Sequence, residues 1–361
     1  VSAMTIGASD MAAFVGIGDV DENGDGHFIG VEGPDLDDDG TPDPIDDLNN
    51  ADVVGIGLTI DSFALVMMKP IVPEGADAST KSYMALKASG GADIYGIDAF
   101  GLSGYLTISL NTGTDTATID PDPTPVDFAA SAALDPATYG SADGLNVLVG
   151  TEPETTYSLI DFTEETLAVA GYIELTIDQF VHVSGQFAFE KGTETLVSLS
   201  DGSGGTGSKS MDYLMIGASE VNAFVGVGGP YFTDSNEDGI IDETDTPESE
   251  GAIGLALSDI NVAVALFNPT VPDGSSYYAL KTSGNAEVVG IDAVTLSVTD
   301  IEVSVNSSSG DPKAVQFQDT FGPSGLEVPV GLGGATEIID FTAPILAAEG
   351  DVTMIIDGFA W

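Results

Sequence analysis

Hydrophobic positions in this chain recur every second residue. Ile56, Leu58 and Ile60 alternate with small or polar residues, as do Phe63, Leu65 and Met67. Alternation of this kind, rich in Val, Ile, Thr and Phe, indicates half-buried β-strands. The same period runs through three further segments: Leu106–Leu110, Ile173–Ile177 and, with one irregularity, Val298–Val305. We therefore expect an all-β protein.

The arrangement of the strands follows from the segments between them. Residues 88–93 and 282–287 are short, Gly-containing and flanked by alternating runs, so they are predicted hairpin turns. This favours elongated antiparallel sheets or sandwiches, with a β-solenoid as the alternative. No segment has a sustained helical stripe, and Phe162–Ala168 offers at most one short helical turn.

The chain contains an internal repeat. The offset between matching segments shrinks from 210 residues at Ile6 and Ile216 to 179 at Gly171 and Gly350, so the second copy has shorter connections. The second copy lacks a counterpart of the strand Val183–Lys191. The matching pairs include Ile6–Gly18 with Ile216–Gly228, Tyr83–Gly90 with Tyr277–Gly284, and Gly171–Phe180 with Gly350–Phe359.

The repeat sets the predicted domain organisation. Residues 1–197 form a first β repeat, and residues 211–361 form a second, truncated one. The Gly/Ser-rich segment 198–210 is either a linker between them or a long hairpin loop of a sheet that continues through both copies.

An acidic loop at 234–245 has the register of a calcium-binding loop. Oxygen-bearing side chains occupy its positions one, three, five, nine and twelve, Gly239 supplies the turn at position six, and Ile240 offers a backbone carbonyl at position seven. A solvated acidic turn is the plain alternative, since Asp, Asn and Gly are common in turns. The predicted ligands are Asp234, Asn236, Asp238, Ile240, Asp242 and Asp245.

The first copy carries two such loops at the corresponding place. The first has Gly26 at the turn and His27 as the carbonyl donor, and the second has Thr41 in that role. The two lie close enough in sequence to form a linked pair of ions. Their predicted ligands are Asp21, Asn23, Asp25, His27 and Glu32, followed by Asp35, Asp37, Asp39, Thr41, Asp43 and Asp46.

Charge narrows the classes of partner. The chain has 361 residues, with 59 acids against 7 basic residues and a formal charge of −52. Nucleic acid and anionic lipid would be repelled. A hydrophobic fraction of 43% argues against disorder, so a folded extracellular protein that binds calcium or is bathed in salt fits both facts. If the charge is considered alone, the alternative is a cytoplasmic protein of a halophile.

Several other classes of chemistry are absent from the sequence. The chain has no cysteine, which excludes disulfides, thiolate metal sites and cysteine nucleophiles. No apolar run is long enough for a membrane-spanning helix. His182 lies in an alternating strand without a Ser or Cys motif, and Asp201–Gly204 lacks the apolar run that precedes an aspartic protease loop. We predict that the protein is not an enzyme.

The repeated block resembles the repeats of giant secreted bacterial proteins, surface and adhesin-like proteins that bind calcium. The resemblance rests on the Gly-Ala-Ser-x-x-x-Ala-Phe-Val-Gly strand, the Asp-x-Asn-x-Asp-Gly insertion, Tyr-x-Ala-Leu-Lys, and Phe187–Lys191. The acidic loops are similar to those of EF-hand and dockerin proteins, but without flanking helices. The resemblance implies an extracellular or cell-surface role in adhesion or filament formation.

Two functions are therefore expected. The first is an extracellular structural repeat, stabilised by Ca²⁺, that self-associates with neighbouring repeats or subunits into a filament, sheath or surface layer. The alternative is an adhesin module that binds carbohydrate or a partner surface through calcium. Neither requires nucleic acid or membrane insertion.

Overall fold

Most of the chain forms β-strands. The structure is a computed structural model that describes residues 2–17, 54–72, 79–95, 97, 100–117, 124–151, 155–178, 180–236, 240–241, 244–245, 247, 251–291 and 293–356. Twelve strands belong to one antiparallel sheet that does not close into a barrel. The all-β prediction is confirmed, and antiparallel pairing is not the arrangement of a β-solenoid.

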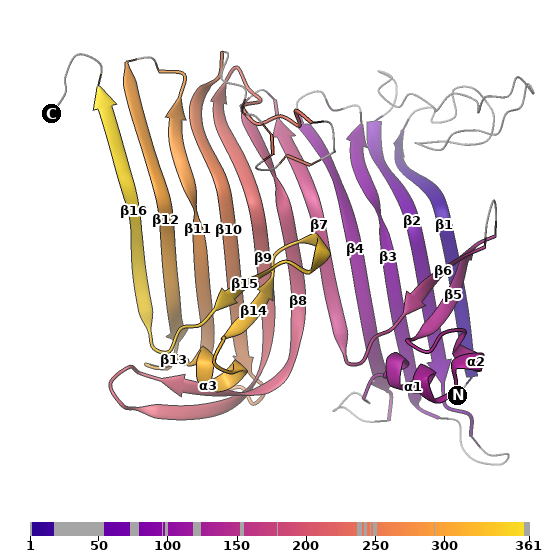
Figure 1. The fold of residues 1–361 in the computed structure, drawn as a ribbon. Coiled ribbons are helices and arrows are strands. Elements are labelled where there is room, and N and C mark those ends of the chain that lie inside the picture. The colour runs from indigo at the N-terminus through magenta and orange to yellow at the C-terminus, as the bar shows by residue number, and fades with distance from the viewer. Residues whose placement is uncertain are drawn as a thin grey trace, which may run out of the picture. The chain divides into compact units, whose positions relative to one another are not determined.

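The chain divides into two compact units. Unit 1 consists of residues 1–97 and 105–169, and unit 2 of residues 98–104 and 170–361. In unit 1 the sheet order is β1 (Ser2–Ile17), β2 (Val54–Lys69), β3 (Lys81–Tyr95) and the greater part of β4 (Phe100–Asp115). One face of this sheet carries α1 (Phe128–Leu134), α2 (Pro136–Tyr139) and the hairpin of β5 (Leu145–Gly150) and β6 (Thr156–Ile160) (Figure 1).

Unit 2 repeats this plan. Its sheet order is β7 (Thr166–Ile177), β8 (Val181–Ser200), β9 (Thr206–Val227), β10 (Ile253–Pro269), β11 (Ser276–Val289), β12 (Val294–Ser309) and β16 (Ile345–Ile356). The short β13 (Ala314–Val315) pairs with β8. The covering elements are α3 (Phe317–Phe321), the hairpin of β14 (Leu326–Pro329) and β15 (Thr336–Ile339), and the 3₁₀ turn η1 (Leu332–Gly334) between those two strands.

Each hydrophobic core lies between the sheet and its covering elements. The fully enclosed side chains come from matching strands of the two copies, and each contributes about 1.5–3 kcal/mol relative to an exposed side chain. Unit 2 adds two buried side chains from β8, Val197 and Leu199. The matched core residues are Met68, Phe128, Val147 and Ile160 in unit 1, and Phe267, Phe317, Val328 and Ile339 in unit 2.

The helices lie in the segments that cover the sheet. Asp127 caps α1, because its carboxylate accepts a hydrogen bond from the Ala130 amide at 2.7 Å. Pro136 stands in the first turn of α2, and Gly140 ends that helix with a left-handed conformation. The one short helical turn that the sequence allowed at 162–168 does not form, since Thr166 begins β7. No helix in the described ranges is long and apolar enough to cross a membrane.

The long strands bend at β-bulges near their middles. In unit 2 the register shifts at neighbouring positions of β8, β9, β10, β11 and β12. Glu220, Asp259 and Asp300 have left-handed φ angles of 52–54° at these bulges, a conformation in which Asp is enriched and Glu is uncommon. Asn285 joins two of them: its amide donates to Asp259 at 3.2 Å, and its side-chain oxygen accepts from the Asp300 amide at 3.2 Å.

The bulges lie at neighbouring positions across the sheet and form a bulge row. Its position shows that the two predicted hairpin turns are wrong. Residues 88–93 lie inside β3 and residues 282–287 inside β11, so neither is a hairpin turn. Gly90 and Gly284 mark close backbone approach instead: a Cβ on Gly90 would lie 2.0 Å from the Thr59 carbonyl oxygen. A glycine within an alternating strand is thus compatible with a bulge as well as with a chain reversal.

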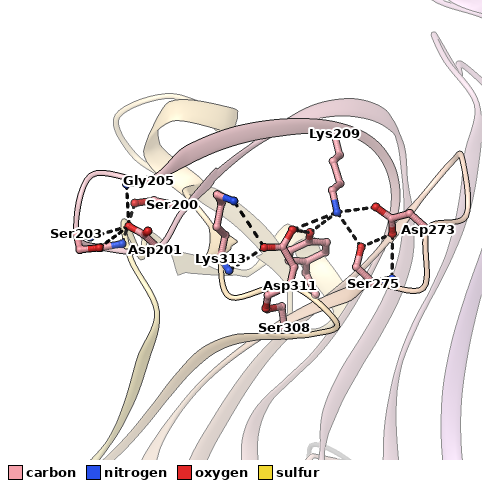
Figure 2. A network of polar contacts seen from close by, with 12 residues as sticks. Ser200, Asp201, Ser203, Gly205, Lys209, Asp273, Ser275, Ser308, Asp311 and Lys313 are labelled. Atoms are coloured by element: carbon pink, nitrogen blue, oxygen red, sulfur yellow. Dashed lines mark hydrogen bonds and ion pairs between the residues drawn. The ribbon is translucent and has the colours of Figure 1, made fainter.

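The Gly/Ser-rich segment 198–210 forms part of a β-hairpin. β8 runs to Ser200 and pairs there with Thr206, the first residue of β9. Asp201 closes the turn, because its Oδ1 accepts hydrogen bonds from the amides of Ser203 and Gly205 at 2.8 and 2.9 Å (Figure 2). Residues 201–205 thus form the turn that joins the paired strands β8 and β9.

A buried asparagine on the fourth strand of each copy holds both ends of the covering segment. Asn306 Nδ2 donates to the carbonyls of Val315 and Ala343 at 2.8 and 3.0 Å. Asn111 Nδ2 does the same with Val126 and Glu164 at 2.9 and 2.7 Å. The two asparagines are 1% and 0% exposed, so they satisfy carbonyls that water does not reach.

We expect Asn306→Ala to lower the free energy of unfolding by about 2 kcal/mol, because two buried carbonyls lose their donor. The loss of Asn306 Oδ1, which has no partner among the described residues, offsets part of the cost. Urea denaturation measures the change, with the exposed Ser309→Ala as control, expected within about 0.5 kcal/mol of the unmodified chain. Equal stability of both variants would contradict the proposed anchoring role.

Candidate functional site

The acidic loop between β9 and β10 is the predicted calcium loop that the structure describes in part. Asp234, Asn236, Ile240 and Asp245 are among the described residues, whereas Asp238 and Asp242 are not. The two predicted loops of the first copy, Asp21–Glu32 and Asp35–Asp46, also lie outside the described residues. The geometry of the site is therefore built from the ends and base of the 234–245 loop.

Asp245 closes the loop on itself. Its Oδ1 accepts hydrogen bonds from the Ser235 amide at 2.8 Å, the Ser235 hydroxyl at 3.1 Å and the Asn236 amide at 3.4 Å. Asn236 Nδ2 donates to Thr244 Oγ1 at 2.9 Å. The second and third positions of the loop are thus bound to the eleventh and twelfth, which brings together ligand positions that lie far apart in the sequence.

Ile241 anchors the loop to the sheet. Its side chain is 5% exposed. Its amide donates to the Tyr172 hydroxyl at 2.9 Å, and its carbonyl accepts from Asn222 Nδ2 at 3.3 Å. Tyr172 lies on β7 and Asn222 on β9, so two strands fix the base of the loop.

A small cavity lies under this anchor. It measures about 10 Å³, close to the space that one water molecule requires, and its lining includes Glu174, His182, Ser184 and Asn222. His182 Nε2 is buried and has no hydrogen-bond partner among the described residues, and Nδ1 is 3.4 Å from Thr176 Oγ1. A water molecule fits both the volume and the unsatisfied nitrogen.

The titratable groups here favour their neutral forms. Burial lowers the pKa of His182, which keeps the imidazole uncharged near neutral pH. Burial raises the pKa of Glu174, and the nearby Asp234 carboxylate raises it further. A cation bound near Asp234 would act in the opposite direction on Glu174, since positive charge favours the carboxylate.

A second, more open cavity of about 240 Å³ lies beside the same loop. Asp245, Asp259 and Glu287 give it an acidic lining, together with Asn222 and Phe232. The Tyr231 hydroxyl donates to Glu287 at 2.8 Å. Burial and this hydrogen bond raise the pKa of Tyr231 to about 12, so the phenol stays protonated. The cavity offers acceptors for cations and hydroxyl groups, and no nucleophile paired with a base among these residues.

The described residues of the 234–245 loop carry the type of oxygen ligand that a hard cation binds. Side-chain oxygens of Asp234, Asn236 and Asp245 and the carbonyl of Ile240 are ligands that calcium prefers. Within the described ranges, no group of three or more His, Asp or Glu side chains could hold a metal ion. The remaining predicted ligands of this loop, Asp238 and Asp242, fall outside those ranges, so the calcium site stays a prediction.

Lys209 organises a second polar cluster (Figure 2). Its Nζ contacts Asp273 at 2.7 Å, Ser275 at 2.9 Å, the Tyr277 hydroxyl at 2.7 Å and Asp311 at 3.2 Å. Burial lowers the pKa of Lys209, but the hydrogen bonds to Asp273, Tyr277 and Asp311 outweigh it and raise the pKa overall. A lysine that stays charged is not a base or nucleophile, so this cluster links β9, β11 and the segment after β12.

Sequence reasoning missed the residues that support the loop. Tyr172, Glu174 and Asn222 lie on strands distant in sequence from the loop, and no spacing rule connects them to it. His182 was expected within an alternating strand, and it lies on β8. One available signal was the polar Asn222 inside an apolar strand.

Comparison of the chain with protein-family models, with curated proteins and with solved structures found no match.

We predict that His182 contributes to the pH dependence of stability. Because burial lowers its folded-state pKa, its neutral form adds stability above the unfolded-state pKa of about 6.5, and this is lost as the pH falls toward the folded-state value. His182→Gln should therefore flatten the fall in unfolding free energy between pH 7 and pH 5.

NMR provides the direct measurement. The chain has two histidines, and His182→Gln identifies the resonance of each. The His182 resonance should titrate below the ordinary histidine range. Titration at or above pH 6.5 would show that burial does not control this residue.

Proposed function

We propose that this protein is an extracellular structural repeat protein that calcium stabilises and that assembles through its sheet edges into a filament, sheath or surface layer. The observation that carries the proposal is the pair of strands at the ends of the described sheet order, β1 in unit 1 and β16 in unit 2. In the part of the chain that the structure describes, β1 pairs only with β2, and β16 only with β12.

Both edges have the properties of association surfaces. Neither strand contains proline or lysine, the residues that soluble proteins commonly place on edges to prevent pairing. Val15 and Ile17 on β1 are 69% and 73% exposed, and Val352 and Met354 on β16 are 68% and 62% exposed. Long apolar edges of this kind favour strand addition.

The charge distribution supports a role for calcium. Of the 59 acids, 13 lie in residues 19–52 and 8 in residues 234–250. These segments connect corresponding pairs of strands, β1 with β2 and β9 with β10. Carboxylates concentrated in this way destabilise the compact state unless cations bind or screen them. The proposed role of the ion is structural, and the proposed role of the protein is not catalytic.

Calcium should raise the stability of the chain. With the ~10⁻⁴–10⁻³ M affinity of extracellular calcium modules, about 10 mM Ca²⁺ adds about 1–3 kcal/mol per site. Thermal melting with calcium, with chelator and with magnesium at equal ionic strength measures this, and Asp238→Asn should remove part of the gain. A melting temperature that chelator leaves unchanged and sodium chloride raises would favour general salt adaptation.

Assembly should depend on the edges. We expect calcium-loaded chains to form multimers in analytical ultracentrifugation and filaments or sheets in electron microscopy. Met354→Lys should reduce assembly, because a charge on an edge strand opposes pairing. Leu134→Lys, on an exposed α1 residue that belongs to neither edge strand, is the matched control. Monomers with and without calcium, or equal effects of the two substitutions, would count against edge assembly.

An adhesin module is the second candidate. The acidic cavity beside the 234–245 loop favours it, because Asp245, Asp259 and Glu287 offer acceptors for sugar hydroxyl groups or for a bridging cation. Glycan arrays probed with calcium and with chelator test this candidate. Calcium-dependent retention of a glycan by monomeric chain would support the adhesin function over assembly.

A further inference from the structure

The internal repeat shows what binds the first strand of a copy. β9, the first strand of the second copy, pairs with β10 on one side and with β8 on the other. β1 is its counterpart in the first copy, and the described residues pair it with β2 alone. The free edge of β1 thus corresponds to an edge that β8 occupies in unit 2.

Matched positions on the two strands differ in burial. Met215 is 4% exposed and Ser219 8% exposed, whereas their counterparts Thr5 and Ser9 are exposed and half-buried. All these side chains point to the face that carries the covering elements, as the alternation along a strand requires. Part of this difference arises because β8 lies against β9, and no described strand lies on that side of β1.

β8 also binds the covering elements of unit 2. Gln186 Oε1 accepts a hydrogen bond from the Leu332 amide at 3.0 Å, and its Nε2 donates to Glu220 at 2.7 Å. Near its end, the Ser198 amide donates to Thr320 Oγ1 at 2.9 Å. β8 therefore packs as part of unit 2, because it is hydrogen-bonded both to the neighbouring strand β9 and to the covering elements.

The β1 edge lies beside an apolar groove. The groove has a volume of about 530 Å³, and Met4, Met67, Met68 and Met84 contribute to its lining together with Tyr83. Methionine side chains adapt to varied apolar and aromatic partners. A strand in the β8 register places Phe189 opposite Ile6, on the same face of the sheet as Met4.

We propose that the edge of β1 is the receptor for the last strand of another repeat of this kind, an extended segment with the pattern of β8. This proposal deepens the assembly proposed above and rests on it. The register is that of β8 on β9: Phe187 opposite Ala8, Phe189 opposite Ile6 and Lys191 opposite Met4.

The repeat argues against direct pairing of β16 with β1. The counterpart of β16 in the first copy is β7, and the sheet order is β7, β8, β9. β7 therefore reaches the first strand of the next copy only through β8. An assembly that follows the internal repeat places a β8-type strand between β16 of one copy and β1 of another.

Cysteine cross-linking tests the site and the register together, because the chain has no cysteine of its own. The probe is a synthetic peptide of residues 181–192 that carries Phe189→Cys, added to the full chain with Ile6→Cys. Directly opposite residues have Cβ atoms about 4.5–5.5 Å apart, against about 7–8 Å for diagonal neighbours. We expect about tenfold more disulfide than with a Phe187→Cys peptide, since a disulfide needs close Cβ atoms.

Two controls and one independent measurement accompany the cross-link. A chain with Leu134→Cys should show no preference between the two peptides. A peptide with Ala188→Pro and Phe189→Pro should not bind, because successive amides point to opposite sides and one of the lost donors faces β1. With unmodified chain and peptide, hydrogen exchange should slow at β1 amides.

The outcomes separate this inference from the proposed function. In-register cross-linking to a chain that remains monomeric in every condition supports the receptor edge and overturns the proposed assembly. Filaments formed by a chain that shows neither register preference nor protection of β1 leave the proposed assembly intact and overturn this inference.

Discussion

The fold depends on one constraint: one face of a sheet of long strands must be shielded from water. A strand alternates its side chains between two faces, so each copy needs a layer that covers one of them. That layer is a helix and a two-stranded hairpin inserted between the fourth and fifth strands of the copy. Asn111 and Asn306 tie both ends of this insertion to the sheet through buried carbonyls. Without that donor, the segments that enter and leave the insertion would bury unpaired carbonyls.

The strands and the repeat could be predicted because their signals are local. Alternation of Ile56 and Leu58 with glycine follows directly from the pleat of a strand. The covering segments could not be predicted in the same way, because α1 is one short helix of small residues without an apolar stripe. Its boundaries were still available in the sequence: Asp127 caps the start, and Pro136 and Gly140 delimit the second helix. The matched pair Val147 with Val328 becomes visible only once the cores are known.

The bulge row shows why the predicted turns failed. Gly and Asn inside an apolar strand indicate either a reversal or a bulge, and local sequence does not separate the two. Across the sheet the difference is clear, because Asn285 exchanges hydrogen bonds with Asp259 and Asp300 on the neighbouring strands. The candidate site was likewise only partly predictable from local sequence. The acidic loop was found from its spacing, whereas Tyr172 and Asn222, which hold Ile241, come from other strands and follow from the fold alone.

Assembly of a chain with a formal charge of −52 requires that the charge be kept away from the contact. β1 carries one acid, Asp10, and β16 carries two, Glu349 and Asp351, while the connecting segments carry dense runs of carboxylates. Backbone pairing at the edges is short-ranged, and repulsion between the loops extends over about 8–10 Å at physiological ionic strength. Cations bound in the loops would therefore lower the barrier to association without touching the edges. Under the proposed assembly, the acidic loops would control when copies come together, and the edge strands would determine which surfaces pair.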